Sequence, residues 1–110
     1  MKRSPTQAEW VRRFGKPALI LPITGYWLNK IWVGEKKEEY REDKPYYQRL
    51  LKKYKDFPTF TVGYRAGYRL DSPMAVCLCT LRKGEGLEEW GAEKGKRYFI
   101  FCILKVYDFE

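Results

Sequence analysis

The sequence of 110 residues contains no histidine and only three cysteines. Without imidazole, Ser-His-Asp and Cys-His nucleophile systems are excluded, as is any zinc site that needs histidine. Cys77, Cys79 and Cys102 include no CxxC pair and lie in apolar runs, so we expect buried, reduced thiols that pack as small hydrophobes. Catalysis, if the protein has any, must use Lys, Glu, Asp, Tyr, Ser, Thr or Cys, and we expect neither a metal nor another cofactor.

Two kinds of segment are also missing. No signal peptide is recognisable, and no apolar run reaches the length of about 20 residues that a membrane-spanning helix needs. The chain has the length of a single domain, and a composition of 45% hydrophobic and 17% aromatic residues is too apolar for a disordered tail. We therefore expect a folded cytoplasmic domain with no membrane contact.

Positive charge is in excess. The 22 Lys and Arg outnumber the 14 Asp and Glu, for a formal net charge of +8, and a field of that sign attracts phosphate groups. The alternative is that the charge serves solubility alone. Residues 1–16 carry five of the cations against one acidic residue, Glu9, and we treat them as a basic N-terminal arm or helix ahead of a single domain at 17–110.

Helix signals alternate with strand signals along the first half of the chain. A first helix is expected to begin with Ser4 as its cap and to end at Gly15; the apolar run "ALILPI" (18–23) then predicts a buried strand. Thr24 can cap a second helix, and Asp43 a third. The charged run "KKEEYRE" (36–42), which lies between those two helices, reads as a short strand.

The second half of the chain is β-rich. Strands are expected in "TFTVGYR", "MAVCLCTL" and "RYFIFCILKVY". The last two are apolar on both faces, which favours a closed or well-covered sheet. The predicted order α-β-α-β-α-β-β-β corresponds to a small α+β domain with a barrel-like sheet and short flanking helices.

The stretch "VGEKKEEYRE" (33–42) places eight ionisable side chains in ten positions. Side chains alternate between the two faces of a strand, so Glu39 and Arg41 share a face. Lys36 follows Gly34 closely and can reach the same side if it lies in the turn before the strand. Arg41 then offers a planar fork for phosphate or a base edge, and Lys36 a point charge. Glu39 can pair with either cation or act as a base, whereas the simpler alternative is a run of solvated ion pairs.

The spacing of Gly34, Lys36, Glu39 and Arg41 spells G-x-K-x-x-E-x-R, which resembles the signature of ASCH (activating signal cointegrator homology) domains in the PUA-like superfamily of small β-barrels. The segments "LILPI", "YREDKPYYQRLL", "GYRLDSP" and "EEWGAEKGKRYFIFCI" are similar to parts of short ASCH proteins of bacteria and their phages. The likeness covers roughly residues 17–106. It implies a PUA-like barrel that binds RNA or nucleotides in a cleft lined by the signature.

The same resemblance implies possible activities. One ASCH group hydrolyses the acyl amide of N4-acetylcytidine, and another cleaves RNA. In the amidohydrolase group a threonine nucleophile stands three residues after the motif lysine, and here that position is Glu39. A carboxylate is a poor substitute for a hydroxyl in acyl transfer. Lys36 and Glu39 remain the candidate catalytic residues, with Thr24 or Tyr68 as the alternative nucleophiles.

Aromatic and basic residues outside the motif are further candidates. Arg65, Tyr68 and Arg69 lie in "GYRAGYRLDSP", where an aromatic flanked by guanidinium groups can stack a base, at about 1–3 kcal/mol per base. Tyr40 and Tyr46 can serve in the same way. Edge packing is the ordinary alternative for each of them.

Three functions stay open at this level. The first is a module that binds RNA, another single-stranded nucleic acid, or a free nucleotide or nucleoside through Lys36, Glu39 and Arg41. The second is a small hydrolase acting on modified nucleosides or on RNA. The third is a phage or host interaction factor that binds another protein. The sequence does not determine the oligomeric state.

Overall fold

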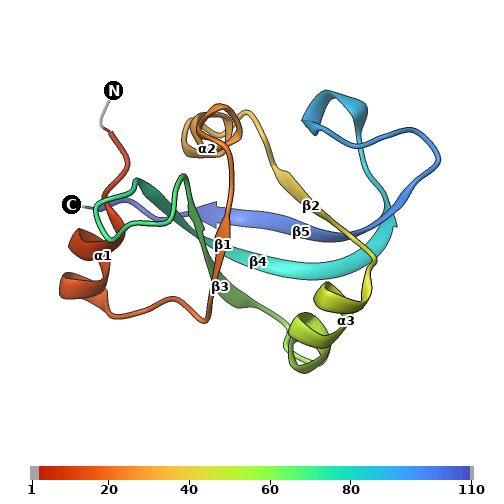
Figure 1. The fold of residues 1–110 in the computed structure, drawn as a ribbon, viewed down its shortest axis with the longest axis horizontal. Coiled ribbons are helices and arrows are strands. Elements are labelled where there is room, and N and C mark those ends of the chain that lie inside the picture. Colours follow the sequence, from red (N-terminus) through yellow and green to blue (C-terminus); the bar gives the residue numbers. More distant parts are fainter. Residues whose placement is uncertain (1–2, 110) are drawn as a thin grey trace.

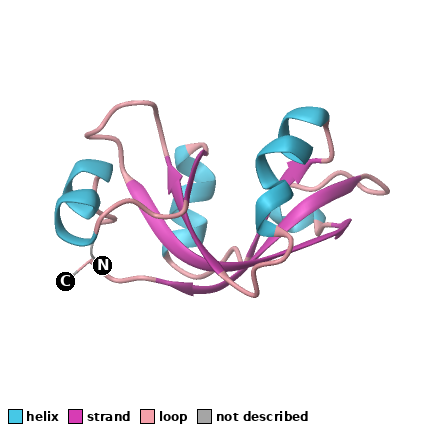
Figure 2. Cartoon of the chain, turned by 90° about the horizontal axis from the view of Figure 1, so that it is seen from below, coloured by secondary structure: helices cyan, strands magenta, loops and turns pink. Residues whose placement is uncertain are grey.

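A five-stranded sheet that curls into a half-barrel forms the body of the molecule in the computed structural model, which describes residues 3–109 (Figures 1 and 2). The α+β class and the predicted order of elements are confirmed. In chain order the elements are α1 (Gln7–Phe14), β1 (Leu19–Pro22), α2 (Gly25–Trp32), β2 (Glu38–Glu42), α3 (Pro45–Leu51), the 3-10 turn η1 (Lys52–Tyr54), β3 (Phe60–Arg65), β4 (Met74–Glu85), the 3-10 turn η2 (Glu88–Trp90) and β5 (Arg97–Val106).

The strands are arranged in the order β1-β3-β4-β5-β2. β1 runs parallel to β3, and the other neighbouring strands are antiparallel. β1 and β2 are therefore the two edges, and no strand ladder joins them. A side chain joins them instead, because Arg41 Nη2 on β2 donates to the backbone carbonyl of Pro22 on β1 at 2.7 Å.

The two faces of the sheet are covered by different elements, which explains why β4 and β5 are apolar on both sides. The inward face carries the main core, to which α2 and α3 contribute Ile31 and Leu51. On the outward face, Trp10 of α1 packs on Met74 and Val76. Further along, Ala92 of the β4–β5 connection covers this face by packing on Tyr98 and Ile100 of β5.

Helix α1 begins two residues later than the sequence predicts. Its cap is Thr6, whose hydroxyl accepts from the Glu9 amide while the Glu9 carboxylate accepts from the Thr6 amide, a reciprocal capping box. Ser4 is not the cap, because the residues ahead of Thr6 run extended beside β4: the Pro5 carbonyl accepts from the Met74 amide at 2.8 Å. Gly15 ends the helix as expected.

The caps of the other helices differ in outcome. Thr24 caps α2 as predicted, since its hydroxyl accepts from the Trp27 amide. The prediction for α3 was wrong: Lys44 occupies the cap position and makes no side-chain cap bond. Asp43 is engaged elsewhere, because its carboxylate accepts from Gln48 and pairs with Lys83.

The helices are short. Within residues 3–109 none of them is both long and apolar enough to cross a membrane.

Candidate functional site

Lys36, Glu39 and Arg41 meet on the inward face of the sheet. In the β2–β5 ladder Glu39 lies opposite Phe101 and Arg41 opposite Phe99, both core residues, so the two charged side chains point into the half-barrel. Lys36 precedes β2, and its ammonium lies 3.2 Å from Glu39 Oε1. Arg41 Nη2 lies 2.7 Å from Glu39 Oε2. We call these three residues the charge cluster.

The charge cluster is almost completely removed from solvent. The side chains of Lys36, Glu39 and Arg41 are 1%, 8% and 11% exposed. Two cations share one carboxylate, so one positive charge is unbalanced at a place where charges are expensive to bury. Burial lowers the pKa of Lys36 below its ordinary value, although the Glu39 carboxylate opposes that shift.

Lys36 is enclosed from several sides. Its ammonium donates to the backbone carbonyl of Trp90 in η2. It also lies 4.2 Å from the centre of the Trp27 ring and 5.1 Å from that of Tyr40, the geometry of cation–π contacts. The Trp90 indole in turn donates to the Glu35 carbonyl at 3.0 Å, so η2 is held against the turn that precedes β2.

Arg41 is the outermost member of the charge cluster. Besides Glu39 and the Pro22 carbonyl, its guanidinium donates to the Tyr47 hydroxyl at 3.2 Å. Its Nε is buried and has no hydrogen-bond partner among the described residues. A buried donor without a partner is uncommon, and it leaves part of the guanidinium fork unsatisfied.

The motif glycine acts through its backbone. Gly34 has φ of +82°, and a Cβ added there would meet no atom within 4 Å. Glycine is therefore required by conformation rather than by space, because L residues with a side chain rarely adopt this φ. The turn that it makes between α2 and β2 is what lets Lys36 reach the same side as Glu39.

Two pairs of aromatic rings contact the charge cluster from its two ends. Tyr26 and Trp27 of α2 form an edge-to-face pair with 4.8 Å between centroids, next to Lys36. Tyr46 and Tyr47 of α3 form another at 5.0 Å, next to Arg41. The outer ring of each pair, Tyr26 and Tyr46, is more than 60% exposed. Of these four, only Tyr46 was singled out from the sequence as a stacking residue; the doublets "YW" and "YY" at the two helix starts were the available signal.

The side chains of the other basic candidates have partners outside the charge cluster. The Arg65 guanidinium donates to Gln7 of α1 and to the Gly67 carbonyl. Arg69 pairs with Asp71 at 3.1 Å, and Tyr68 is 82% exposed in the same loop. None of these contacts links Arg65, Tyr68 or Arg69 to the charge cluster.

The remaining sequence candidates, Thr24 and Tyr40, use their hydroxyls in structural hydrogen bonds. The Thr24 hydroxyl serves as a helix cap, and the Tyr40 hydroxyl donates to Glu38. In the basic N-terminal segment, Lys2 lies outside the described residues, and the described part is folded against the sheet through Trp10. Among residues 3–109 no three Cys, Asp or Glu side chains come together in the manner of metal ligands.

The cysteines lie where the sequence predicted apolar surroundings. Cys77 and Cys79 are buried in the main core, and Cys102 is half-buried. Burial raises the pKa of the Cys79 thiol to about 12, so it is held as a neutral thiol.

Comparison with protein-family models finds no matching family, and comparison with curated proteins and with solved structures finds no match either.

Proposed function

We propose that the protein is a nucleic-acid or nucleotide-binding module, with RNA as the favoured partner, built as a small PUA-like barrel of the ASCH type. The observation that supports this proposal is the unbalanced positive charge of the charge cluster, where Lys36 and Arg41 share only Glu39. A phosphate group supplies the negative charge that the cluster lacks, and the carbonyl edge of a base can accept a hydrogen bond from the guanidinium.

In this proposal Arg41 makes the direct contact, because it is the most exposed of the three side chains. Glu39 fixes the orientation of its guanidinium, and Lys36 supplies the second charge from behind Glu39. Tyr26 and Tyr46, exposed at the two ends of the cluster, offer ring faces for bases on either side of the bound phosphate. Stacking of that kind tolerates any base, which suits single-stranded nucleic acid.

The hydrolase alternative is favoured by one observation, the lowered pKa of Lys36. A lysine with a lowered pKa loses its proton more readily. The neutral amine can then act as the base that takes a proton from water in amide hydrolysis. Opposing this, the Lys36 ammonium is enclosed by Glu39, Trp27 and the Trp90 carbonyl. Release of cytidine from N4-acetylcytidine that is lost in Lys36→Met would establish the enzyme; no turnover by wild type would leave the binding module.

The test of the binding module compares two neighbouring lysines. Lys36 is buried in the charge cluster, whereas Lys37 is exposed. Fluorescence anisotropy with a short single-stranded RNA across a salt series is measured for wild type, Lys36→Met and Lys37→Met. We expect wild-type affinity to fall steeply with salt. Lys36→Met should weaken binding by about tenfold or more, because the charge cluster loses the net positive charge that attracts the phosphate.

The control variant removes the same charge from the surface, so Lys37→Met should weaken binding by much less. Thermal melts of both variants establish that they are folded. Equal losses in the two variants would place the contact outside the charge cluster, and affinity that survives moderate salt would argue against a phosphate-dominated interface.

A further inference from the structure

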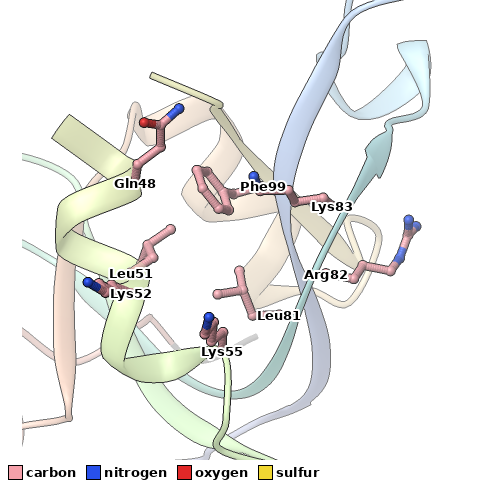
Figure 3. Close-up of a pocket in the computed structure, with 8 residues that line it drawn as sticks. All are labelled: Gln48, Leu51, Lys52, Lys55, Leu81, Arg82, Lys83 and Phe99. Carbon is pink, nitrogen blue, oxygen red and sulfur yellow. The ribbon is translucent and has the colours of Figure 1, made fainter. Parts of the chain in front are cut away.

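A hollow of about 410 Å³ lies between α3–η1 and the paired strands β4 and β5 (Figure 3). Its volume falls in the range of about 300–1,000 Å³ that is typical of small-molecule sites. None of its lining residues belongs to the charge cluster, so a ligand can bind in it without contacting that cluster. We call it the α3 pocket; its lining residues are Gln48, Leu51, Lys52, Lys55, Leu81, Arg82, Lys83 and Phe99.

The floor of the α3 pocket is apolar. Figure 3 shows Leu51, Leu81 and Phe99 pointing into the space between the helix and the strands. Leu51 and Phe99 belong to the main core, and Leu81 packs against it. A flat apolar group that enters the pocket therefore meets aliphatic side chains and an aromatic ring instead of water.

One wall of the pocket is fixed by Asp43. The Lys83 ammonium lies 3.2 Å from Asp43 Oδ2 and 4.9 Å from the centre of the Phe99 ring. Gln48 donates to Asp43 Oδ1 at 3.0 Å. The positive charge of Lys83 is therefore already balanced, and this wall offers little attraction to a further anion.

The opposite wall carries charge that is not balanced. Lys52 and Lys55 are exposed, and their side chains make no ion pair or hydrogen bond within residues 3–109. Both also line a neighbouring hollow of about 650 Å³, together with Arg49 and Lys53. Four cations thus lie within seven residues. Asp56 is the acidic residue that also lines this neighbouring hollow. An anion is attracted to this wall rather than to the one with Asp43.

We propose that the α3 pocket binds a nucleotide, with its phosphate on Lys52 and Lys55 and its base on the floor of Leu51, Leu81 and Phe99. Charge complementarity favours a ligand with a phosphate group. The apolar floor favours a phosphate that carries a base over an inorganic anion. The same chemistry is offered by a free mononucleotide and by one nucleotide of a single strand, so the experiment includes both.

The experiment is a titration of the ¹⁵N-labelled protein followed by amide chemical shifts. The probes are cytidine 5′-monophosphate, cytidine, inorganic phosphate and an eight-residue oligocytidylate RNA. We expect the mononucleotide to shift amides of residues 51–55 and 81–83. Cytidine and inorganic phosphate should each bind about tenfold more weakly or worse, since each lacks half of the contacts.

The matched variants test the position of the phosphate. Lys52→Glu/Lys55→Glu should weaken mononucleotide binding by about tenfold or more, since charge-assisted hydrogen bonds dominate phosphate recognition. The control Lys16→Glu/Lys94→Glu changes the net charge equally at exposed positions elsewhere and should have little effect. Equal losses in the two variants would overturn the proposal, as would shifts confined to residues 36–41. Binding of inorganic phosphate as tight as that of the mononucleotide would overturn the base contact.

The affinities of the mononucleotide and of the RNA, measured at the same residues, distinguish a free nucleotide from a nucleotide within a strand. A similar affinity for the mononucleotide and the RNA identifies a pocket for free nucleotides, and much tighter RNA binding identifies a contact along a strand; either supports the proposal. Binding that survives in Lys36→Met but is lost in Lys52→Glu/Lys55→Glu would support the α3 pocket while contradicting the charge cluster as the nucleic-acid site.

Discussion

At the scale of single residues, Glu39 is the side chain on which the charge cluster depends. Its two carboxylate oxygens each hold a different cation, Lys36 on one side and Arg41 on the other. All three are desolvated, and a buried cation that loses its counterion keeps the full desolvation cost without the compensating attraction.

We expect Glu39→Gln to destabilise the protein strongly, by about 3–5 kcal/mol, because it leaves two buried cations without a carboxylate. Chemical denaturation measures the free energy of unfolding of the variant and of wild type. The control is Glu35→Gln, which breaks an exposed pair with Lys30 and should cost about 0–1 kcal/mol. A loss as small as that of the control would mean that the cluster is solvated in solution.

The spacing of the motif determined part of this arrangement. Alternation along a strand places Glu39 and Arg41 on one face whatever the fold. It does not say which face is buried. That depends on the ladder with β5, which sets the two residues opposite Phe101 and Phe99 and so turns a charged pair toward the core.

At the scale of elements, the start of α1 shows how a neighbouring strand changes a local preference. Ser4-Pro5 and Thr6 followed by Glu9 are competing helix starts. The hydrogen bond from the Met74 amide to the Pro5 carbonyl keeps the first of these extended, so the capping box at Thr6 is the start that forms.

We expect Thr6→Ala to destabilise the protein by about 0.5–2 kcal/mol through loss of the cap. Ser4→Ala should have a smaller effect, since the Ser4 side chain makes no cap bond. Urea denaturation of the two variants compares them directly. A larger loss for Ser4→Ala than for Thr6→Ala would show that the helix begins earlier than the structure places it.

At the scale of the whole molecule, the half-barrel is joined across its open side by a side chain. Arg41 of β2 donates to the Pro22 carbonyl of β1, and Arg41 is itself held by Glu39 and Tyr47. The charge cluster therefore connects two edge strands that share no ladder, and it contributes to closure of the fold as well as to any binding.

We expect Arg41→Lys to loosen this junction, since lysine keeps the charge but lacks the planar fork. The amide of Ile23, which follows β1 and donates to the Arg65 carbonyl, should exchange its hydrogen about tenfold faster or more, as loss of hydrogen bonds to a charged group implies. Hydrogen exchange followed by NMR measures this. Arg49→Lys, at an exposed position on α3, should leave the rate unchanged; equal acceleration in both variants would contradict the role of Arg41.

The sequence by itself determined the α+β class, the order of the elements, the two-sided apolar character of β4 and β5, and the shared face of Glu39 and Arg41. These follow from periodicity, caps and turns, which act over a few residues. The tertiary structure alone decided which faces are buried, that Arg41 reaches Pro22 across the open side, that Tyr26 and Tyr46 lie at the two ends of the charge cluster, and that Lys52 and Lys55 border a pocket with Phe99. Each of these depends on contacts between residues far apart in the chain, and local sequence patterns carry no record of such contacts.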